Sequence, residues 1–422
     1  MTNRAWRPLL DRGDAERAWT AIRDVAEALE HAACDDPGLP DGSAGLAVFF
    51  AYLGAATGEE RWGESAHRFL DHAIDALAER PLPPPLHGGF TGIAWTLEHL
   101  DGLLFEADED DADDPIGESL VELLERRPAR RGEFDLITGL TGYGVYALEA
   151  LPRPAARQCV KLVIERLAET GEEAEGGFAW FTPPDLLPEH QRESAPAGNF
   201  NLGLAHGVPA VVSFLAACAG AGVLPESRRP MLDGAVAWIL AHKREAVSGW
   251  CFPSWVADGV APFAARLAWC YGDPGVAAAL LAAARHAGRA DWEAEALDTA
   301  RRAAARDFGH AGVLDAGLCH GSAGLGHLFN RMHQASGDPL LADAARAWFR
   351  RALDERKPGE GVGGFLTWAP EDPDVPRWMP VPGVLLGSAG VALALLGAVS
   401  SLEPAWDRSL AISIPLSPGA TA

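Results

Sequence analysis

A glycine-containing turn recurs seven times along the chain, each time directly before an apolar segment. From the last residue of the first turn, Gly45, to that of the second, Gly92, is 47 positions. The longest later step, from Gly142 to Ala210, is 68. The turns read Gly42-Ser43-Ala44-Gly45, Gly89-Phe90-Thr91-Gly92, Gly139-Leu140-Thr141-Gly142, Gly207-Val208-Pro209-Ala210, Gly272-Asp273-Pro274-Gly275, Gly321-Ser322-Ala323-Gly324 and Gly387-Ser388-Ala389-Gly390. A repeat of this length indicates units that stack on one another to bury a shared core.

Two kinds of helical segment alternate between these turns. Segments that follow a turn, such as 46–50 and 391–396, are apolar on nearly all sides, so they must be buried on all sides. The other segments are charged and amphipathic, and they span 14–31, 60–79, 117–127, 155–169, 226–246, 291–307 and 338–354. We therefore predict an all-α fold, in which about seven helical hairpins form an α/α toroid with inner and outer helix rings.

The whole chain, residues 1–422, is predicted to form this single toroid domain. Glycine permits tight chain reversal, so the turns should gather the N-termini of the inner helices at one end of the ring. Strand signals are sparse, and the proline-rich stretches 81–85, 183–184 and 370–382 are predicted to be loops.

The chain is strongly acidic: 35 Lys and Arg against 59 Asp and Glu give a net charge of −24. This charge argues against a nucleic acid or an anionic membrane as partner, because both select for basic surfaces. We recognise no signal peptide and no apolar run of membrane-spanning length, which favours a cytoplasmic protein without a transmembrane segment. The six cysteines show no framework spacing, so free thiols or metal ligands are expected.

Two of these cysteines occupy matched positions on neighbouring turns. Cys270 lies on the fifth turn and Cys319 on the sixth, 49 positions later, with His320 beside it. Equivalent turns of adjacent repeats lie side by side in a toroid, so the three side chains should meet. Two thiolates and an imidazole make a zinc site with one open position, which is the catalytic rather than the structural pattern. The alternative is that these cysteines simply pack in the core.

The motifs around these residues resemble those of the lanthionine synthetase C-like cyclases. The resemblance rests on Trp269-Cys270-Tyr271-Gly272-Asp273-Pro274-Gly275, Leu318-Cys319-His320-Gly321, Asn201-Leu202-Gly203-Leu204-Ala205-His206-Gly207 and the segment 133–142. With the glycine turns, it covers nearly the whole chain. The length of the chain is similar to that of the stand-alone cyclase of class I lanthipeptide pathways, with no dehydratase region preceding the cyclase motifs. One departure is Ala210, which stands where the other turns have glycine.

The resemblance implies an α/α toroid that closes thioether rings in a zinc-dependent reaction. Cysteine thiols of a dehydrated precursor peptide would add to dehydroalanine or dehydrobutyrine. By the same resemblance, Cys270, Cys319 and His320 would hold Zn²⁺, and a dehydratase and an exporter are candidate partners. The resemblance assigns acid/base roles to His206 and Asp135, and an active-site role to Arg266.

Each of these three residues could instead have a purely structural role. His206 could pin an inner helix, Asp135 could act as an N-cap, and Arg266 could pair with a carboxylate. The remaining histidine and cysteine candidates are predicted to be structural, and they are His87, His327, Cys34, Cys159, Cys218 and Cys251.

Three other functions stay open from the sequence. A glycosidase would need a pair of carboxylates and no metal. A zinc-dependent prenyltransferase would need a basic diphosphate site, whereas the glycine turns carry few basic residues. A non-catalytic, zinc-containing relative that binds peptides as a scaffold would keep the metal but tolerate the loss of His206.

Overall fold

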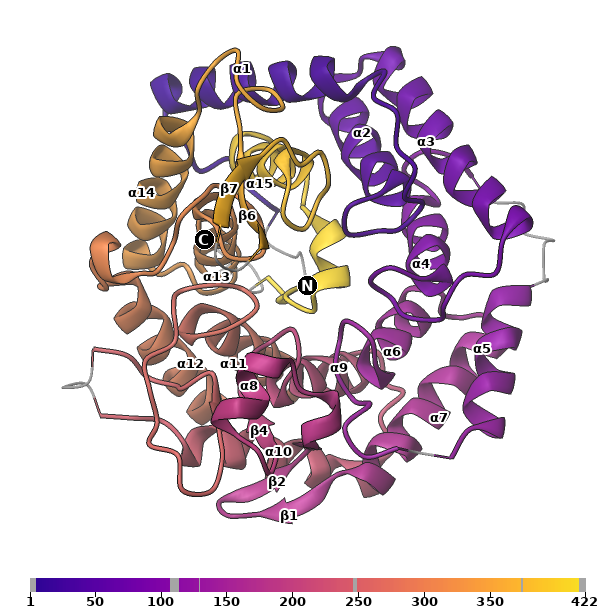
Figure 1. Cartoon of the computed structure of the whole chain (residues 1–422), viewed down its shortest axis with the longest axis vertical. Helices are drawn as coiled ribbons and strands as arrows, with labels where there is room; N and C mark the ends of the chain where they lie inside the picture. Colours follow the sequence, from indigo (N-terminus) through magenta and orange to yellow (C-terminus); the bar gives the residue numbers. More distant parts are fainter. Residues whose placement is uncertain (1–4, 107–113, 129, 246–248, 373–374, 417–422) are drawn as a thin grey trace.

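Each of the seven glycine turns is followed by a helix, and these helices form the inner ring of a toroid (Figure 1). The computed structural model describes residues 5–106, 114–128, 130–245, 249–372 and 375–416. The inner helices are α2 (Ser43–Thr57), α4 (Phe90–Leu100), α6 (Leu140–Glu149), α9 (Val208–Gly220), α11 (Asp273–Ala287), α13 (Ser322–Ser336) and α15 (Ser388–Val399). Each packs against the next, and α15 packs against α2, so the ring is closed.

The outer ring consists of amphipathic helices whose apolar stripes face inwards. They are α1 (Arg12–Leu29), α3 (Glu60–Glu79), α5 (Pro115–Arg126), α7 (Pro154–Thr170), α10 (Arg229–Ala241), α12 (Ala290–Ala304) and α14 (Pro339–Glu355). On α3, for example, Trp62, Phe69 and Leu70 are buried between exposed Glu, Arg and Asp residues. The first helix, α1, packs against the last, α15, so the two ends of the chain build one hairpin. The predicted α/α toroid is confirmed.

Neighbouring turns are joined by backbone hydrogen bonds at one end of the ring. The bonds run from His87 N to Ile137 O, Leu136 N to Ala205 O, Ala205 N to Cys270 O, Trp269 N to Cys319 O, Cys319 N to Leu385 O and Val384 N to Pro40 O, with lengths of 2.7–3.3 Å. The N-termini of the inner helices therefore meet at one end, as predicted. Glycine is needed for this packing: a Cβ on Gly324 would lie 1.8 Å from the Leu318 carbonyl oxygen. The fourth turn keeps its bonds to both neighbours despite Ala210.

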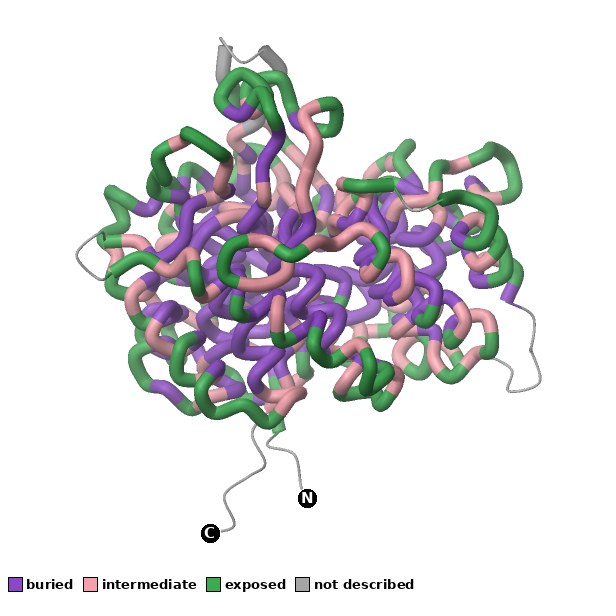
Figure 2. Tube along the Cα trace, turned by 90° about the horizontal axis from the view of Figure 1, so that it is seen from below, coloured by how far each residue is buried: buried purple, intermediate pink, exposed green. Residues whose placement is uncertain are grey.

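The inner helices contribute much of the hydrophobic core. Figure 2 shows that the buried residues gather in the interior of the molecule. A short 3₁₀ helix, η5 (Ala405–Leu410), fills the middle of the ring at the level of the core. Its Asp407 is fully buried and contacts His327 Nε2 and Arg331 Nε, both at 2.9 Å. Because all three side chains are sequestered from water, their mutual charges and hydrogen bonds must replace hydration.

Small strands and short helices lie at the end of the ring where the glycine turns meet. They are β1 (Glu172–Ala174), β2 (Gly177–Ala179), β3 (Phe181–Thr182), η1 (Pro184–Leu186), α8 (Glu189–Ser194), β4 (Asn199–Asn201), β5 (Trp255–Val256), β6 (Thr367–Asp372) and β7 (Val375–Met379). The prediction of loops for 183–184 and 370–382 was wrong in part. Pro184 begins η1, and β6 pairs antiparallel with β7, with Pro370 opposite Pro376. Both strands of a two-stranded hairpin are edge strands, where a missing N–H is tolerated.

Candidate active site

The fifth and sixth turns hold Cys270 and Cys319 side by side. The Cys319 carbonyl oxygen accepts hydrogen bonds from the backbone N–H groups of Trp269 and Cys270, at 2.9 and 3.4 Å. Gly272, which caps α11, has φ +98°, and a Cβ there would lie 2.0 Å from the Arg266 carbonyl oxygen. Only glycine therefore fits the turn that positions Cys270.

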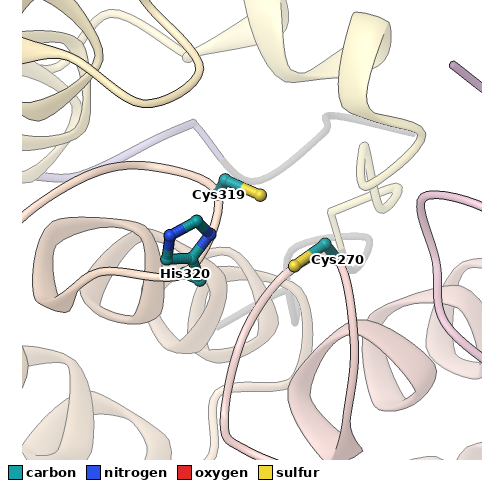
Figure 3. A group of neighbouring side chains, drawn as sticks. All are labelled: Cys270, Cys319 and His320. Atoms are coloured by element: carbon teal, nitrogen blue, oxygen red, sulfur yellow. The ribbon is translucent and has the colours of Figure 1, made fainter. Parts of the chain in front are cut away.

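The ligand atoms of Cys270, Cys319 and His320 all lie within 4.8 Å of one another (Figure 3). Both cysteines are buried, and Nδ1 of His320 is a buried nitrogen with no hydrogen-bond partner among the residues that the structure describes. Two sulfurs and an imidazole are the donor set that Zn²⁺ prefers. Within the described residues, no further Cys, His, Asp or Glu belongs to the cluster, which matches the three-ligand pattern of catalytic sites. The residues present therefore fit a zinc ion.

The two sulfurs lie within 4.8 Å of each other, so each affects the protonation of the other. The hydrogen bond from Cys319, supported by His320 and by the charge of Arg266, lowers the pKa of Cys270 well below its usual value, although burial opposes this. The same hydrogen bond to Cys270, together with burial, raises the pKa of Cys319. Arg266 itself is exposed on the segment leading to the fifth turn. Its positive charge therefore acts on both sulfurs from the solvent side.

A histidine–aspartate pair lies on the third and fourth turns. Nδ1 of His206 is 2.7 Å from Oδ2 of Asp135, and Oδ1 of Asp135 accepts hydrogen bonds from the backbone N–H and the hydroxyl of Thr138. Burial would lower the pKa of His206, but the hydrogen bond and charge of Asp135, with the charge of Cys270, raise it. Asp135 does not cap α6, whose N-cap is Gly139. It orients His206 and the Thr138 backbone instead.

A cavity of about 750 Å³ opens beside this pair. His206, Asp135, Tyr271 and Asn201 are among the residues that line it. Tyr271 directly follows Cys270, and its hydroxyl oxygen accepts a hydrogen bond of 3.2 Å from Nδ2 of Asn201; burial raises the pKa of the phenol. The lining residues do not include Cys270, Cys319, His320 or Arg266. Tyr271 thus connects the metal-ligand turn to the cavity.

Sequence reasoning missed Tyr271, Asn201 and Thr138 as parts of the site. Tyr271 directly follows Cys270, and Asn201 begins the motif that contains His206, so their positions were a usable signal. Thr138 could not be singled out, because its role depends on the turn geometry around Asp135.

The other histidine and cysteine candidates lie outside the Cys₂His cluster and the His206–Asp135 pair. His327 makes a buried contact to Asp407, as predicted. His87 is buried close to Trp269, and burial lowers its pKa to about 4. All six cysteines are free; Cys159, Cys218 and Cys251 are buried in the core, and Cys34 is partly buried.

The fold is a closed ring of helical hairpins, and its glycine turns carry a Cys₂His cluster and a His–Asp pair. These features define a class of toroidal proteins with a candidate zinc centre. A family model, described as lanthionine synthetase C-like protein, matches residues 34–411. The chain belongs to this family, and the resemblance inferred from the motifs is confirmed.

Two solved structures are similar to the chain. Nisin cyclase has a TM-score of 0.71 at 19% sequence identity, over 95% of this chain and 98% of that chain. Cellobiose 2-epimerase from Bacillus thermoamylovorans has a TM-score of 0.52 at 11% identity, over 92% of this chain and 99% of that chain. Both likenesses establish the toroidal fold. No curated protein sequence matches the chain, and none of its described helices has the length and apolar character needed to span a bilayer.

Proposed function

We propose that this protein is a zinc-dependent lanthipeptide cyclase. Its substrate would be a dehydrated precursor peptide, in which cysteine thiols add to dehydroalanine or dehydrobutyrine to form thioether rings. The observation that carries the proposal is the convergence of Cys270, Cys319 and His320 on adjoining turns of a lanthionine synthetase C-like toroid. A dehydratase would supply this substrate, and an exporter would remove the product.

The ligands Cys270, Cys319 and His320 would hold Zn²⁺ at the end of the ring where the inner helices begin. When bound, the ion lowers the pKa of a substrate thiol so that the sulfur is a nucleophile at neutral pH. The two protein sulfurs supply negative charge to the site, and this keeps a bound sulfur electron-rich.

The reaction breaks the S–H bond of the cysteine thiol and the alkene π bond, forms a C–S bond at the β-carbon and places a proton on the α-carbon. His206 suits the proton-transfer steps, because Asp135 fixes Nδ1 and leaves Nε2 for the substrate. Because its pKa is raised, the His206 ring stays protonated closer to neutral pH than an ordinary histidine does. A positioned acid or base of this kind contributes about 10²–10⁴-fold in rate.

Arg266 and Tyr271 would act on the charge that develops during addition. Attack at the β-carbon places negative charge on the carbonyl oxygen of the acceptor residue. A guanidinium or a phenol that faces this oxygen stabilises the enolate. Tyr271 lines the cavity next to His206, and Arg266 contributes its charge from the edge of the sulfur pair.

Metal content tests the first part of the proposal. We expect the purified protein to contain one zinc per chain, and Cys270→Ala to lose most of it. Cys159→Ala is the matched control, because Cys159 is also a buried free cysteine but lies on α7. A wild-type protein that does not bind zinc, or equal zinc in the two variants, would contradict the proposal.

Ring closure tests the second part. The protein is mixed with a dehydrated precursor peptide, and free thiols are counted while the peptide mass is followed. We expect the thiols to disappear without a change in mass. Zinc binding with unchanged thiols on an authentic substrate would favour the scaffold function instead.

A further inference from the structure

The cavity beside His206 is lined by two unlike groups of residues. The polar groups of the proposed site are His206, Asp135, Tyr271 and Asn201. A second group, called the apolar wall, comes from a loop, the helix α5, the start of α6, and the helix η1 with the residue after it; its residues include Pro84, Leu123, Leu124, Leu140, Leu186 and Leu187. The proposed chemistry uses only the polar group, so the apolar wall has no role in it.

The apolar wall is fixed in place by its surroundings. Leu124, Leu140 and Leu187 are buried in the protein, whereas Leu186 is 38% exposed. Asp185, next to Leu186, forms an exposed ion pair of 2.8 Å with Arg130, which adds little to the stability of this segment. A surface of this kind is complementary to an apolar group and needs no rearrangement to receive it.

The size of the cavity limits how far this wall lies from the reacting atoms. A sphere of the same volume is about 11 Å across, which corresponds to about three residues of extended peptide. A substrate whose reacting residue faces His206 therefore places the side chains of its next residues against the leucines.

We propose that this wall is a specificity pocket for an apolar side chain within about three residues of the substrate cysteine. The inference rests on the proposed function and adds a substrate class to it: precursor peptides with leucine, isoleucine, valine or phenylalanine beside the ring-forming cysteine. Charged side chains are disfavoured at the leucines, because these apolar side chains offer an aspartate or a lysine no hydrogen-bond partner in exchange for water.

Three arginines, Arg127, Arg130 and Arg166, also line the cavity, and each is ion-paired. Arg127 and Arg130 share Glu133, at 3.7 and 3.5 Å, Arg130 also contacts Asp185 at 2.8 Å, and Arg166 contacts Glu169 at 2.7 Å. A lysine beside the cysteine therefore gains little from these carboxylates, because they are already paired.

The first experiment compares substrates on the wild-type protein. A series of dehydrated peptides carries one cysteine and one dehydroalanine, with leucine, aspartate or lysine at each of the three positions on either side of the cysteine. We expect leucine at one position to raise kcat/KM roughly 10- to 100-fold over lysine and aspartate, through KM. Equal values at every position, or a preference for aspartate that indicates recognition by the arginines, would overturn the inference.

The second experiment changes the wall itself. Leu186→Glu alters an exposed wall residue, and Leu340→Glu alters a leucine of 58% exposure on the outer helix α14. We expect Leu186→Glu to raise KM for the leucine peptide about 10-fold and to lower KM for the lysine peptide, with kcat and zinc content unchanged. Leu340→Glu should behave as wild type. Identical behaviour of the two variants would refute the pocket.

A binding measurement separates this inference from the proposed function. Dye-labelled peptides with serine in place of cysteine cannot react, and their Kd values are read from fluorescence anisotropy. Tighter binding of the leucine peptide, lost in Leu186→Glu, supports the pocket even if no ring is ever closed. Ring closure without any leucine preference supports the cyclase and refutes the pocket.

Discussion

Two of the histidine–aspartate pairs among the described residues have similar N–O distances and can be compared. At the turn end, His206 lies 2.7 Å from Asp135, and in the core His327 lies 2.9 Å from Asp407. Their surroundings differ. The His206 side chain is 43% exposed at the cavity, whereas both members of the core pair are fully buried.

This difference sends the pKa values of the two histidines in opposite directions. For both, burial favours the neutral ring. Asp135 outweighs burial and raises the pKa of His206. For His327, complete burial outweighs the hydrogen bond and charge of Asp407, and the charge of Arg331 adds to the effect of burial, so the pKa of His327 is lowered. A His–Asp pair holds a proton more readily where the imidazole is less deeply buried.

The largest expected effect is on catalysis at the open pair. His206→Ala should lower kcat for ring closure about 10²–10⁴-fold, because a positioned proton donor is lost. Zinc content should be unchanged. His310→Ala, which removes a histidine of 86% side-chain exposure, is the control. Ring closure by His206→Ala at the wild-type rate would remove His206 from the chemistry.

The next effect is on stability at the closed pair. Asp407→Asn should lower the free energy of unfolding by about 3–5 kcal/mol, because it leaves the Arg331 guanidinium buried beside a neutral partner. Urea denaturation measures the change. Asp135→Asn, at the cavity, should cost less, about 1.5–3 kcal/mol for a hydrogen bond to a charged group. Equal losses for the two variants would show that the pairs do not differ as described.

The two histidines should also give opposite pH dependence of stability. Unfolded histidine titrates near pH 6.5. His206 has a raised folded pKa, so its stabilisation is fully present below about pH 6.5 and is lost as pH rises through the folded pKa. His327 has a lowered folded pKa, so stability falls as pH drops below about 6.5, where only the unfolded state gains the proton.

Denaturation between pH 5 and pH 8.5 tests this pair of slopes. His206→Gln should flatten the loss of stability on the alkaline side, and His327→Gln the loss on the acid side. A change on the same side in both variants would contradict the assignments.

The smallest expected effect concerns the group that orients Asp135. Thr138→Val removes the hydroxyl that donates to Oδ1 at 3.1 Å but keeps the backbone N–H bond. Loss of one such bond corresponds to about 1 kcal/mol, or roughly a fivefold drop in kcat. KM and zinc content should stay at wild-type values. A larger drop in kcat would mean that the hydroxyl does more than orient the carboxylate.

Much of the fold was predictable because each glycine turn directly precedes an inner helix in the sequence. Gly321 and its counterparts cap the inner helices, and the apolar runs after them have no alternative to burial. The same repeat spacing is enough to predict that Cys270 lies opposite Cys319. The roles assigned to His206, Asp135 and Arg266 came from the family resemblance and remain predictions.

The remaining features depend on contacts between distant segments. The apolar wall joins Leu124 of α5 to Leu186 of η1, which no local pattern connects. The position of η5 depends on the pairing of Asp407 with Arg331, 76 residues away. The β6–β7 hairpin was missed because its prolines outweighed its strand residues, and their tolerance follows from an edge position that only the fold reveals.

The packing of α1 against α15 has a consequence for the order in which the molecule can be assembled. On the turn that bears Cys319, the backbone N–H of this cysteine donates to the carbonyl oxygen of Leu385, just ahead of α15. A ribosome-tethered chain that still lacks residues 388–399 cannot close the ring, because α15 packs against both α1 and α2. The candidate ligand turns therefore reach their final setting only after α15 has been synthesised.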